Sequence, residues 1–290
     1  MTLTATRFFQ SPAGRASPEV EDRFFTDLRT RNATFKRTGN DRFHDLDEVC
    51  VRCFADADVK IGKVLDVGIS SGTTTLALSD RLHKAGHPAD VIGTDLSVDG
   101  HLVTAYPGVR VLTDEVGYPL QYDVLGMVLR PWRRRADYAT GMVLVRAAAN
   151  AWIGRRAKRL LMQGKGGSAA VQLVSPRVSG HPHVRVEKND IFADTAEFRG
   201  RFDFIRAANI LNRGYFDEDQ LRKAMANVVR YLAGPGAWLL VARSTKGQHV
   251  GTLFRVSDDG RYMNVVDRYC GGSEVEWLVL ETPLPAEWAK

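Results

Sequence analysis

The most informative stretch of the chain is Lys63-Val64-Leu65-Asp66-Val67-Gly68-Ile69-Ser70-Ser71-Gly72-Thr73-Thr74-Thr75. Its short apolar run, which ends in glycine, is typical of a strand that is covered on both faces. The hydroxyl residues and spaced leucines that follow predict a helix ending near Gly86. Because Gly68 and Gly72 lack side chains, backbone N–H groups at the start of this helix can approach a ligand closely. The stretch therefore predicts a strand, a turn and a helix, with a ligand at the turn.

The spacing of the glycines excludes two familiar nucleotide-binding loops. A phosphate-binding P-loop requires G-x-x-x-x-G-K-[ST], and no lysine follows Gly72. The dinucleotide fingerprint requires G-x-G-x-x-G, and Ser70 stands where its second glycine belongs. What remains is an acid, a glycine and, four residues later, a second glycine at the end of a first strand.

A second apolar run, Val91-Ile92-Gly93-Thr94-Asp95-Leu96, ends in an acid 23 residues beyond Gly72. In doubly wound folds, a carboxylate at this place accepts hydrogen bonds from both ribose hydroxyls. Asp95 is therefore a predicted ribose-binding residue. The alternative interpretation is that Asp95 caps a following helix.

Later segments continue the alternation of strands and helices. The predicted elements are a third strand at His183–Glu187, a fourth at Phe202–Leu211, a helix from about Asp217 to Leu232 and a fifth strand at Ala237–Ala242. Beyond them we predict a hairpin of Val250–Val256 and Tyr262–Val266 and one more strand at Val275–Glu281. The sequence thus predicts a Rossmann-like α/β fold: a doubly wound, mostly parallel sheet, preceded by N-terminal helices and followed by antiparallel C-terminal strands.

Together these motifs resemble those of class I S-adenosylmethionine-dependent methyltransferases. The resemblance rests on the glycine turn, on Asp95 and on the strand–helix–Pro-Gly–strand order of residues 202–243. That family usually has a further glycine at the place of Ser70. The run from Arg206 to Phe216 is also similar to the chemotaxis-receptor (CheR-type) glutamate methyltransferases, in which an arginine and an asparagine are adjacent. Here Ala207 and Ala208 separate Arg206 from Asn209.

The resemblance implies S-adenosylmethionine as the cofactor and S-adenosyl-L-homocysteine as the product. It implies that Asp190 meets the adenine amino group and Ile191 the ring; without the resemblance, Asp190 would be an ordinary turn aspartate. Arg37, in a segment similar to the receptor enzymes' Thr/Arg motif, is implied to hold the methionine end. The complete implied cofactor-binding set is Arg37, Asp66, Gly68, Ile69, Ser70, Gly72, Thr73, Asp95, Leu96, Asp190, Ile191 and Asn209.

The sequence indicates the catalytic residues less clearly. Asn209, at the end of the fourth strand, and Tyr215 are the candidates, and an equally good interpretation of Asn209 is a cap of the following turn. The segment Tyr118–Tyr122 is a further candidate lining of the acceptor site. No general base is assigned among the histidines near predicted strand ends, which are His181, His183 and His249.

The composition suits one large α/β domain with additions. The chain has 290 residues, of which 44% are hydrophobic and 26% charged. Its first residues lack a basic-then-apolar signal pattern, no apolar run is long enough to span a bilayer, and three cysteines favour a reducing compartment. We therefore expect a cytoplasmic protein, with Cys50 and Cys53 packed in a helix and no metal site.

We expect a helical N-terminal segment at residues 1–57 and a methyltransferase domain at 58–290. About ninety residues separate Asp95 from Asp190, far more than a plain crossover connection needs. We therefore predict a long helical insertion at residues 100–182. Because ligands bind beside such a connection in open α/β sheets, the insertion is a candidate lid or substrate-recognition element.

The insertion carries the basic charge of the chain. Residues 130–165 contain ten lysines or arginines and one acid, Asp137, a net charge of +9, whereas the whole chain carries +6. Between the basic clusters lies an apolar, predicted helical run, Tyr138–Ile153, with Trp132 and Trp152 at its ends. Three interpretations stay open: a peripheral contact with an anionic membrane, a surface for RNA or an acidic partner, and a helix packed on the domain with a solvated basic face.

A helical wheel bears on the membrane interpretation. Arg146 falls inside the apolar stripe, which does not suit a helix that lies in a membrane surface. A break at Gly154 would weaken this objection. The stripe consists of Met142, Ala149, Ile153 and Leu160.

The predicted function is transfer of a methyl group from S-adenosylmethionine to an acceptor that the sequence does not identify, with a small or lipid-like molecule favoured. Two alternatives are a protein carboxyl methyltransferase of the chemotaxis-receptor type and a non-catalytic, SAM-binding regulatory protein. The Asn-Pro-Pro-Tyr motif of amino-methylating nucleic-acid enzymes is absent, so a nucleic-acid acceptor is not favoured. The oligomeric state is left open.

Overall fold

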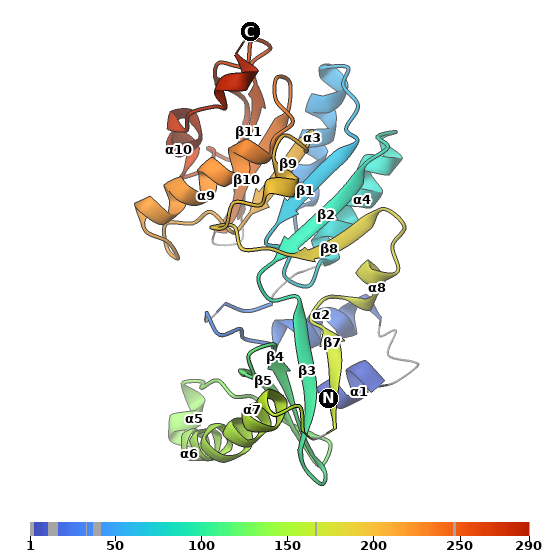
Figure 1. Ribbon diagram of the computed structural model, residues 1–290, viewed down its shortest axis with the longest axis vertical. Helices are drawn as coiled ribbons and strands as arrows, with labels where there is room; N and C mark the ends of the chain where they lie inside the picture. Colours follow the sequence, from blue (N-terminus) through green and yellow to red (C-terminus); the bar gives the residue numbers. More distant parts are fainter. Residues whose placement is uncertain are drawn as a thin grey trace. The chain divides into compact units, whose positions relative to one another are not determined.

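Figure 1 shows the computed structural model of the protein, which describes residues 3–10, 17–32, 34–36, 42–165, 167–245 and 248–289. The chain forms two compact units, each with a sheet of its own. The first, here called the Rossmann unit, consists of Asp41–Leu96 and Val178–Lys290. The second, the insertion unit, consists of Met1–Asn40 and Ser97–Arg177.

A seven-stranded sheet forms the centre of the Rossmann unit, in the order β12-β11-β10-β9-β1-β2-β8. Its strands are β1 (Lys63–Val67), β2 (Asp90–Asp95), β8 (Val184–Lys188), β9 (Phe204–Ala208), β10 (Trp238–Thr245), β11 (Gln248–Val256) and β12 (Met263–Tyr269). Numbered along the chain, the first five strands of the unit are parallel and stand in the doubly wound order 3-2-1-4-5. β11 pairs antiparallel with β10, and β12 with β11. The predicted fold class, with its antiparallel C-terminal strands, is confirmed.

Helices cover both faces of this sheet because successive strand residues point to opposite sides. Val64 packs with residues of α3 (His44–Asp56) and α4 (Thr73–Lys84), whereas Leu65 packs with residues of α9 (Glu218–Tyr231) and α10 (Glu276–Glu281). α9 begins with a capping box: Asp217 accepts a hydrogen bond from the Gln220 N–H, and Gln220 accepts one from the Asp217 N–H. Short elements nearby in the chain are α8 (Pro176–Ser179), η2 (Ala196–Phe198) and η3 (Ala286–Trp288).

One predicted strand of the Rossmann unit is a helix. The sequence predicts a strand at Val275–Glu281, but Glu276–Glu281 form α10. The reason is the spacing of the apolar residues. Val275, Leu278 and Val279 stand three and four positions apart, which places them on one helical face, and all three are buried in the core. The prediction of a strand at these residues is therefore wrong.

The insertion unit contains a five-stranded antiparallel sheet in the order β6-β5-β4-β3-β7. Its strands are β3 (Asp99–Tyr106), β4 (Val109–Asp114), β5 (Pro119–Val124), β6 (Met127–Leu129) and β7 (Ser168–Gln172), and its later helices are α5 (Ala136–Ala139), α6 (Met142–Ala149), the π-helix η1 (Asn150–Gly154) and α7 (Arg155–Met162). The insertion is thus a mixed α/β structure, and the prediction that it is helical holds only for its second half. None of the helices that the structure describes has both the length and the apolar character that crossing a bilayer requires.

Tight turns explain the strands of the insertion unit. Leu125 and Gly126, between β5 and β6, have φ angles of 50° and 81°, as a two-residue hairpin turn requires. Gly108, between β3 and β4, has a φ of 73°. These glycines separate short alternating segments, a pattern of hairpins that the sequence analysis did not use.

The N-terminal helices α1 (Ala5–Gln10) and α2 (Pro18–Thr26) belong to the insertion unit. Phe8 and Phe24 are buried with Leu102 of its sheet, and the Ala5 N–H donates to Gln121, 116 residues away, at 2.6 Å. The unit boundaries therefore differ from the predicted ones: the N-terminal residues group with the insertion, α3 groups with the Rossmann unit, and the insertion runs from 97 to 177. Local patterns cannot show contacts between segments so far apart in the chain.

Candidate functional site

The candidate site lies in the Rossmann unit, where its parallel strands end. In doubly wound sheets, ligands bind at the carboxyl ends of the strands, at the point where the strand order reverses. Here that point lies between β1 and β9, which are neighbours in the sheet although β2 and β8 come between them in the chain. Around this edge the chain places the turn after β1, Asp95 at the end of β2, Asp190 after β8 and Asn209 after β9.

The turn after β1 has a backbone conformation that favours glycine. Gly68, Ser70 and Gly72 have φ angles of 76°, 60° and 81°, all in the left-handed region. The positive φ of Ser70 explains why a glycine suits this position in the family that the motif resembles. At Gly72 space is short as well, because a Cβ atom would lie 2.8 Å from a methyl group of Val178. Gly72 is therefore required both for its φ and for its size.

Backbone hydrogen bonds tie this turn to the neighbouring strand. The N–H groups of Gly68 and Ile69 both donate to the carbonyl of Thr94, at 2.7 and 3.0 Å. Ile69 is buried, and its side chain fills the space beside Gly93, where a Cβ atom would lie 2.9 Å from it. The side chain of Ile69 therefore anchors the turn in the core.

The start of α4 has hydrogen-bonding capacity that the helix does not use. The first N–H groups of a helix lack intrahelical partners, and Gly72, the N-cap of α4, has no side chain to satisfy them. The hydroxyl of Thr73 is buried and has no hydrogen-bond partner among the described residues. A buried polar atom without a partner costs about 1–3 kcal/mol. This hydroxyl and the adjacent N–H groups are therefore suited to binding a polar group of a ligand.

Asp95 faces the glycine turn. Its carboxylate accepts a hydrogen bond from the Ser70 N–H at 2.8 Å, and its backbone carbonyl accepts one from the Asn189 N–H at 3.2 Å. Strand β3 follows β2 in the chain where a helix would be needed, so the interpretation of Asp95 as a helix cap is wrong. The next residue, Leu96, is 51% exposed. The structure thus brings Ser70, Asp95 and an open apolar side chain to one place.

Asp190 stays at the surface after β8. Its side chain is exposed, and its Oδ1 accepts a hydrogen bond from the Phe192 N–H at 3.0 Å, which is the geometry of an aspartate turn. Ile191 is buried in the core instead, where its carbonyl accepts a hydrogen bond from Asn227 at 2.9 Å. Asp190 is therefore a turn aspartate, as the alternative interpretation has it. Its position at the carboxyl end of β8 is also compatible with a ligand contact.

Asp66, the acid of the first motif, is part of a buried ion network. Arg206 donates to its two carboxylate oxygens at 2.9 and 2.6 Å, and the Thr75 hydroxyl donates to it at 2.7 Å. A second carboxylate, that of Asp47, accepts hydrogen bonds from Arg206 at 3.0 Å. Asp66, Asp47 and Arg206 are all nearly inaccessible to solvent. The side chain of Asp66 thus joins β1, β9 and α4 from within the core.

The network holds two carboxylates and one guanidinium. Burial raises the pKa of Asp47 to about 6, against the opposing effect of Arg206. Burial alone would lower the pKa of Arg206, but the two carboxylates raise it above its ordinary value, so the guanidinium keeps its proton. This network is not among the predictions from the sequence. A signal was present, because an arginine inside the apolar strand Phe204–Ala208 needs a buried partner.

Asn209 joins the ends of β9 and β10. Its φ is 62°, and its side-chain oxygen accepts a hydrogen bond from the Ser244 N–H at 2.7 Å. The Ser244 hydroxyl accepts a hydrogen bond from Arg42 Nε at 3.1 Å and lies 2.9 Å from Nδ1 of His249. Burial first, and then the charge of Arg42, lowers the pKa of His249, so its imidazole is neutral at pH 7. These bonds agree with the interpretation of Asn209 as a satisfied turn residue at the site edge.

No role for Ser244 or Arg42 is predicted from the sequence, and His249 is not predicted to be a general base. The pairing of β10 with β11 sets Ser244 opposite His249. The predicted hairpin begins one strand later, at Val250–Val256 with Tyr262–Val266, so it did not reveal this pair. A prediction of the hairpin in which β10 pairs with β11 would have placed Ser244 opposite His249.

Other predicted residues lie apart from these contacts. Tyr215 is 62% exposed, and its N–H donates to the Asn212 carbonyl in a turn. Tyr122 is buried within the insertion unit, where its hydroxyl donates to Asn150 at 2.7 Å, so its side chain cannot line an acceptor site. Arg37 lies outside the described residues. In the described ranges, no group of three or more histidine, cysteine or acidic residues is arranged to hold a metal ion.

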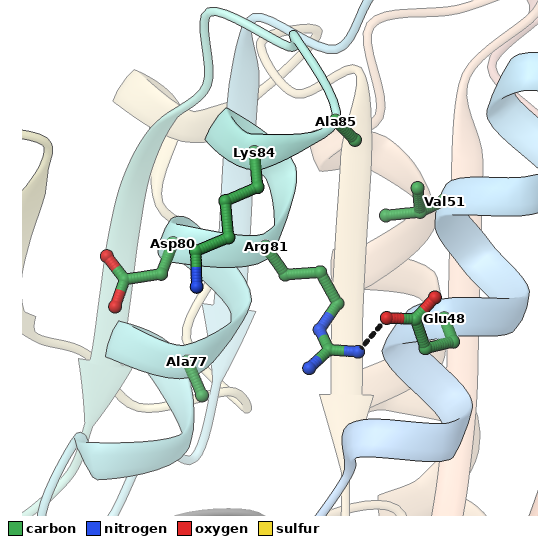
Figure 2. Close-up of a pocket in the computed structure, with 7 residues that line it drawn as sticks. All are labelled: Glu48, Val51, Ala77, Asp80, Arg81, Lys84 and Ala85. Atoms are coloured by element: carbon green, nitrogen blue, oxygen red, sulfur yellow. Dashed lines mark hydrogen bonds and ion pairs between the residues drawn. The ribbon is translucent and has the colours of Figure 1, made fainter.

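Figure 2 shows a groove of about 530 Å³ between α3 and α4, lined largely by charged and small side chains. Arg81 pairs with Glu48 across it. α4 begins at the carboxyl ends of the strands and leads toward the amino end of β2. The second half of α4 lines the groove, so the groove lies away from the carboxyl ends of the strands. We therefore assign no ligand to it.

The similarity of this chain to known proteins is distant. No protein-family model matches the chain, and no curated protein matches it by sequence. One similar solved structure is the N-methyltransferase NodS from Bradyrhizobium japonicum WM9 in complex with S-adenosyl-L-homocysteine, at 17% identity over 69% of this chain, with a TM-score of 0.31. Another is SAM-bound CalS10, an amino pentose methyltransferase from Micromonospora echinaspora, at 14% identity over 77% of this chain, with a TM-score of 0.32.

A third similar structure is the DszA carbon methyltransferase, at 17% identity over 84% of this chain, with a TM-score of 0.36. The chain spans 61%, 67% and 43% of the lengths of NodS, CalS10 and DszA. All three are methyltransferases. At these TM-scores the similarities carry no argument about this chain, and the assignment of a function to it rests on the site itself.

Proposed function

We propose that the protein is an S-adenosylmethionine-dependent methyltransferase. The observation that carries the proposal is the contact of the glycine turn with Asp95, whose carboxylate accepts the Ser70 N–H at 2.8 Å beside the reversal of strand order. A carboxylate at this place suits the two hydroxyls of a ribose. The Thr73 hydroxyl, which has no hydrogen-bond partner among the described residues, and the start of α4 offer further polar contacts on the same turn. These residues fit the nucleoside part of the cofactor.

When bound, the cofactor supplies a methyl group that its sulfonium makes electrophilic. The chain then has to hold the donor and the acceptor in line and to exclude water, and it needs no nucleophile of its own. Gly72 allows the backbone at the start of α4 to approach the nucleoside. The Asp66–Arg206 pair holds β1 and β9 together beneath the turn. Asn209 is our candidate for bordering the acceptor, because it follows β9 at the reversal point.

Replacement of Asp95 by asparagine tests the cofactor site. D95N removes the charge that accepts the ribose hydroxyls, and we expect about 10- to 100-fold weaker binding of S-adenosylmethionine, since a hydrogen bond to a charged group contributes about 1.5–3 kcal/mol. Isothermal titration calorimetry measures the affinity. D90N is the matched control, because Asp90 stands at the other end of the same strand and its side chain is 80% exposed.

The calorimetry has two outcomes that contradict the proposal. One is no heat of binding with S-adenosylmethionine by the unaltered chain. The other is equal affinity in D95N, D90N and the unaltered chain, which would place the nucleoside elsewhere.

We propose a small or lipid-like methyl acceptor. The exposed Leu96 at the site edge supports this choice. Transfer of a labelled methyl group into a cell extract, followed by separation into lipid, RNA, protein and small molecules, identifies the class. Label in protein carboxyl groups would favour the chemotaxis-receptor type of activity instead. Binding without any transfer would favour a regulatory protein.

We also propose a cytoplasmic location with a peripheral membrane contact through residues 130–165. The three cysteines, Cys50, Cys53 and Cys270, are all free, which supports a reducing compartment. Fractionation of cells into cytosol, membranes and periplasm or lumen tests the location. Recovery of the protein from an oxidising compartment would contradict it.

A further inference from the structure

The helices α6, η1 and α7 of the insertion unit carry apolar side chains that are exposed. Leu144, Val145 and Trp152 are 74%, 49% and 75% exposed, and Ala148 is exposed as well. Positions 144, 148 and 152 stand four residues apart, so they lie along one side of the helical run. We call Leu144, Val145, Ala148 and Trp152 the exposed apolar face.

This face differs from the apolar stripe that the sequence predicts. Ala149 and Ala157 are 5% and 0% exposed and pack, with Ile153 beside them, in a core formed with the unit's own sheet. Arg146 lies on this buried side too, where it pairs with Asp137 at 2.7 Å. Arg146 therefore does not interrupt the exposed apolar face, and the objection that the helical wheel raises no longer applies. In the described structure, one apolar side of the helix is covered and the other is open.

Exposed basic side chains flank the exposed apolar face at both ends. The acid of this segment, Asp137, is buried against Arg146 and does not offset their charge at the surface. The flanking residues are Arg133, Arg134 and Arg135 before the helix and Arg155, Lys158 and Arg159 after Trp152. The surface thus combines aliphatic groups, an open tryptophan and a concentrated positive charge.

We propose that this surface docks on an anionic lipid bilayer. Negatively charged headgroups attract the flanking arginines, tryptophan favours the boundary between water and acyl chains, and the aliphatic groups gain by leaving water. RNA would engage the basic residues and Trp152, but it offers no comparable environment for Leu144 and Val145. The aliphatic side chains of the exposed apolar face therefore favour a lipid bilayer over RNA as the partner. This inference names the residues and the kind of membrane for the peripheral contact proposed above, and it does not depend on the proposed methyl transfer.

Co-sedimentation of the full chain with vesicles tests the proposal. We expect binding to vesicles of phosphatidylcholine mixed with phosphatidylglycerol, and much weaker binding to phosphatidylcholine alone, at about 0.1 M salt. Binding should shift the tryptophan emission to the blue, and W152F should lose most of this shift because Trp152 is the open tryptophan of the surface. Failure to bind the anionic vesicles at low salt overturns the proposal.

Paired variants separate the two parts of the surface. R155Q/R159Q should weaken binding to the anionic vesicles about 25-fold, about five-fold for each charge. L144S/W152S should weaken it as well, by removing the apolar contact. The matched controls are R185Q/K223Q and Y262S/L280S, exposed side chains of the same kinds on the Rossmann unit, which should bind as the unaltered chain does. Equal binding by all variants overturns the proposal.

Two further measurements keep the result unambiguous. A fluorescently labelled single-stranded RNA oligonucleotide is titrated with the same proteins, and RNA binding without vesicle binding overturns the lipid assignment. Calorimetry with S-adenosylmethionine is run on the same preparations without vesicles. Vesicle binding without cofactor binding supports this inference and contradicts the proposed function, and the reverse result does the opposite. Far-UV circular dichroism verifies that each variant is folded.

Discussion

Arg206 shows how a single residue organises the candidate site from beneath. Its guanidinium donates to both oxygens of Asp66 and to both of Asp47, and it also donates to the Thr74 carbonyl at 3.0 Å. These bonds join β1, β9, α3 and the first turn of α4. The same first turn carries the Thr73 hydroxyl that is suited to a ligand. The network therefore positions the turn and does not itself reach the open edge.

Replacement of Arg206 by methionine tests this role. R206M leaves Asp47 and Asp66 buried without their cation, so we expect the free energy of unfolding to fall by about 3–5 kcal/mol at neutral pH. Urea unfolding followed by circular dichroism measures the change. R185M, on the exposed side of β8, is the control and should change stability by no more than about 0.5 kcal/mol. Equal effects of the two substitutions would contradict the role assigned to Arg206.

At the scale of elements, the π-helix η1 explains how one helical run can carry two apolar sides. Its wider turn lets Asn150 accept the Tyr122 hydroxyl at 2.7 Å and donate to the Pro131 carbonyl at 3.0 Å. Gly154 lies against the same tyrosine. The run therefore seats its inner side on the sheet around Tyr122, while Trp152 stays open on the outer side.

Gly154 provides a test of this arrangement. Alanine in place of glycine normally stabilises a helix by about 0.5–1 kcal/mol. At Gly154 an added Cβ atom would lie 2.7 Å from the Tyr122 hydroxyl, so we expect G154A to destabilise the protein by about 1–3 kcal/mol instead. Thermal and urea unfolding measure the effect. Addition of Y122F, which removes the hydroxyl, should recover part of the loss, and stabilisation by G154A alone would contradict the contact.

At the scale of the whole molecule, each of the two units has a hydrophobic core of its own, so we expect the units to unfold as separate cooperative units. Phe24 is buried in the insertion unit and stacks on Phe8, with ring centroids 4.0 Å apart. Phe204 is buried in the Rossmann unit beside Phe54 and Trp238. Each unit consists of two segments, and the segments of the two units alternate along the chain, so stability in one depends on residues distant in sequence.

Reciprocal substitutions test this division. F24A and F204A each leave a cavity, which typically costs about 3–5 kcal/mol. We expect F24A to reduce hydrogen-exchange protection in β3, β4 and β5, and F204A to reduce it in β1, β9 and β10. Exchange read by mass spectrometry measures both patterns. Loss of protection across both sheets in each variant would show a single cooperative unit.

Local sequence was enough to predict the parallel sheet and the glycine turn. Strand and turn patterns depend on neighbouring residues, so the apolar runs, Gly68 and Gly72 identified their elements correctly. Local patterns gave a wrong prediction at Val275–Glu281, where the residues were predicted as a strand but have helical apolar spacing. They also failed in β3–β6, where short hairpins follow one another closely. Asp95 lies at the end of β2, as the sequence predicts, and its role in binding a ribose stays a prediction.

The partners of the site residues required the folded chain. Asp66 and Arg206 are 140 residues apart, and Arg42 and Ser244 are 202 apart, so no local pattern links them. The same reason applies to the basic insertion. The sequence of residues 130–165 shows its charge and its apolar run, but which side of the helix is buried depends on the sheet against which the helix packs. Composition and short-range spacing therefore specify the elements and their chemistry. Burial, pairing and exposure are properties of contacts between distant segments, and they exist only once the chain has folded.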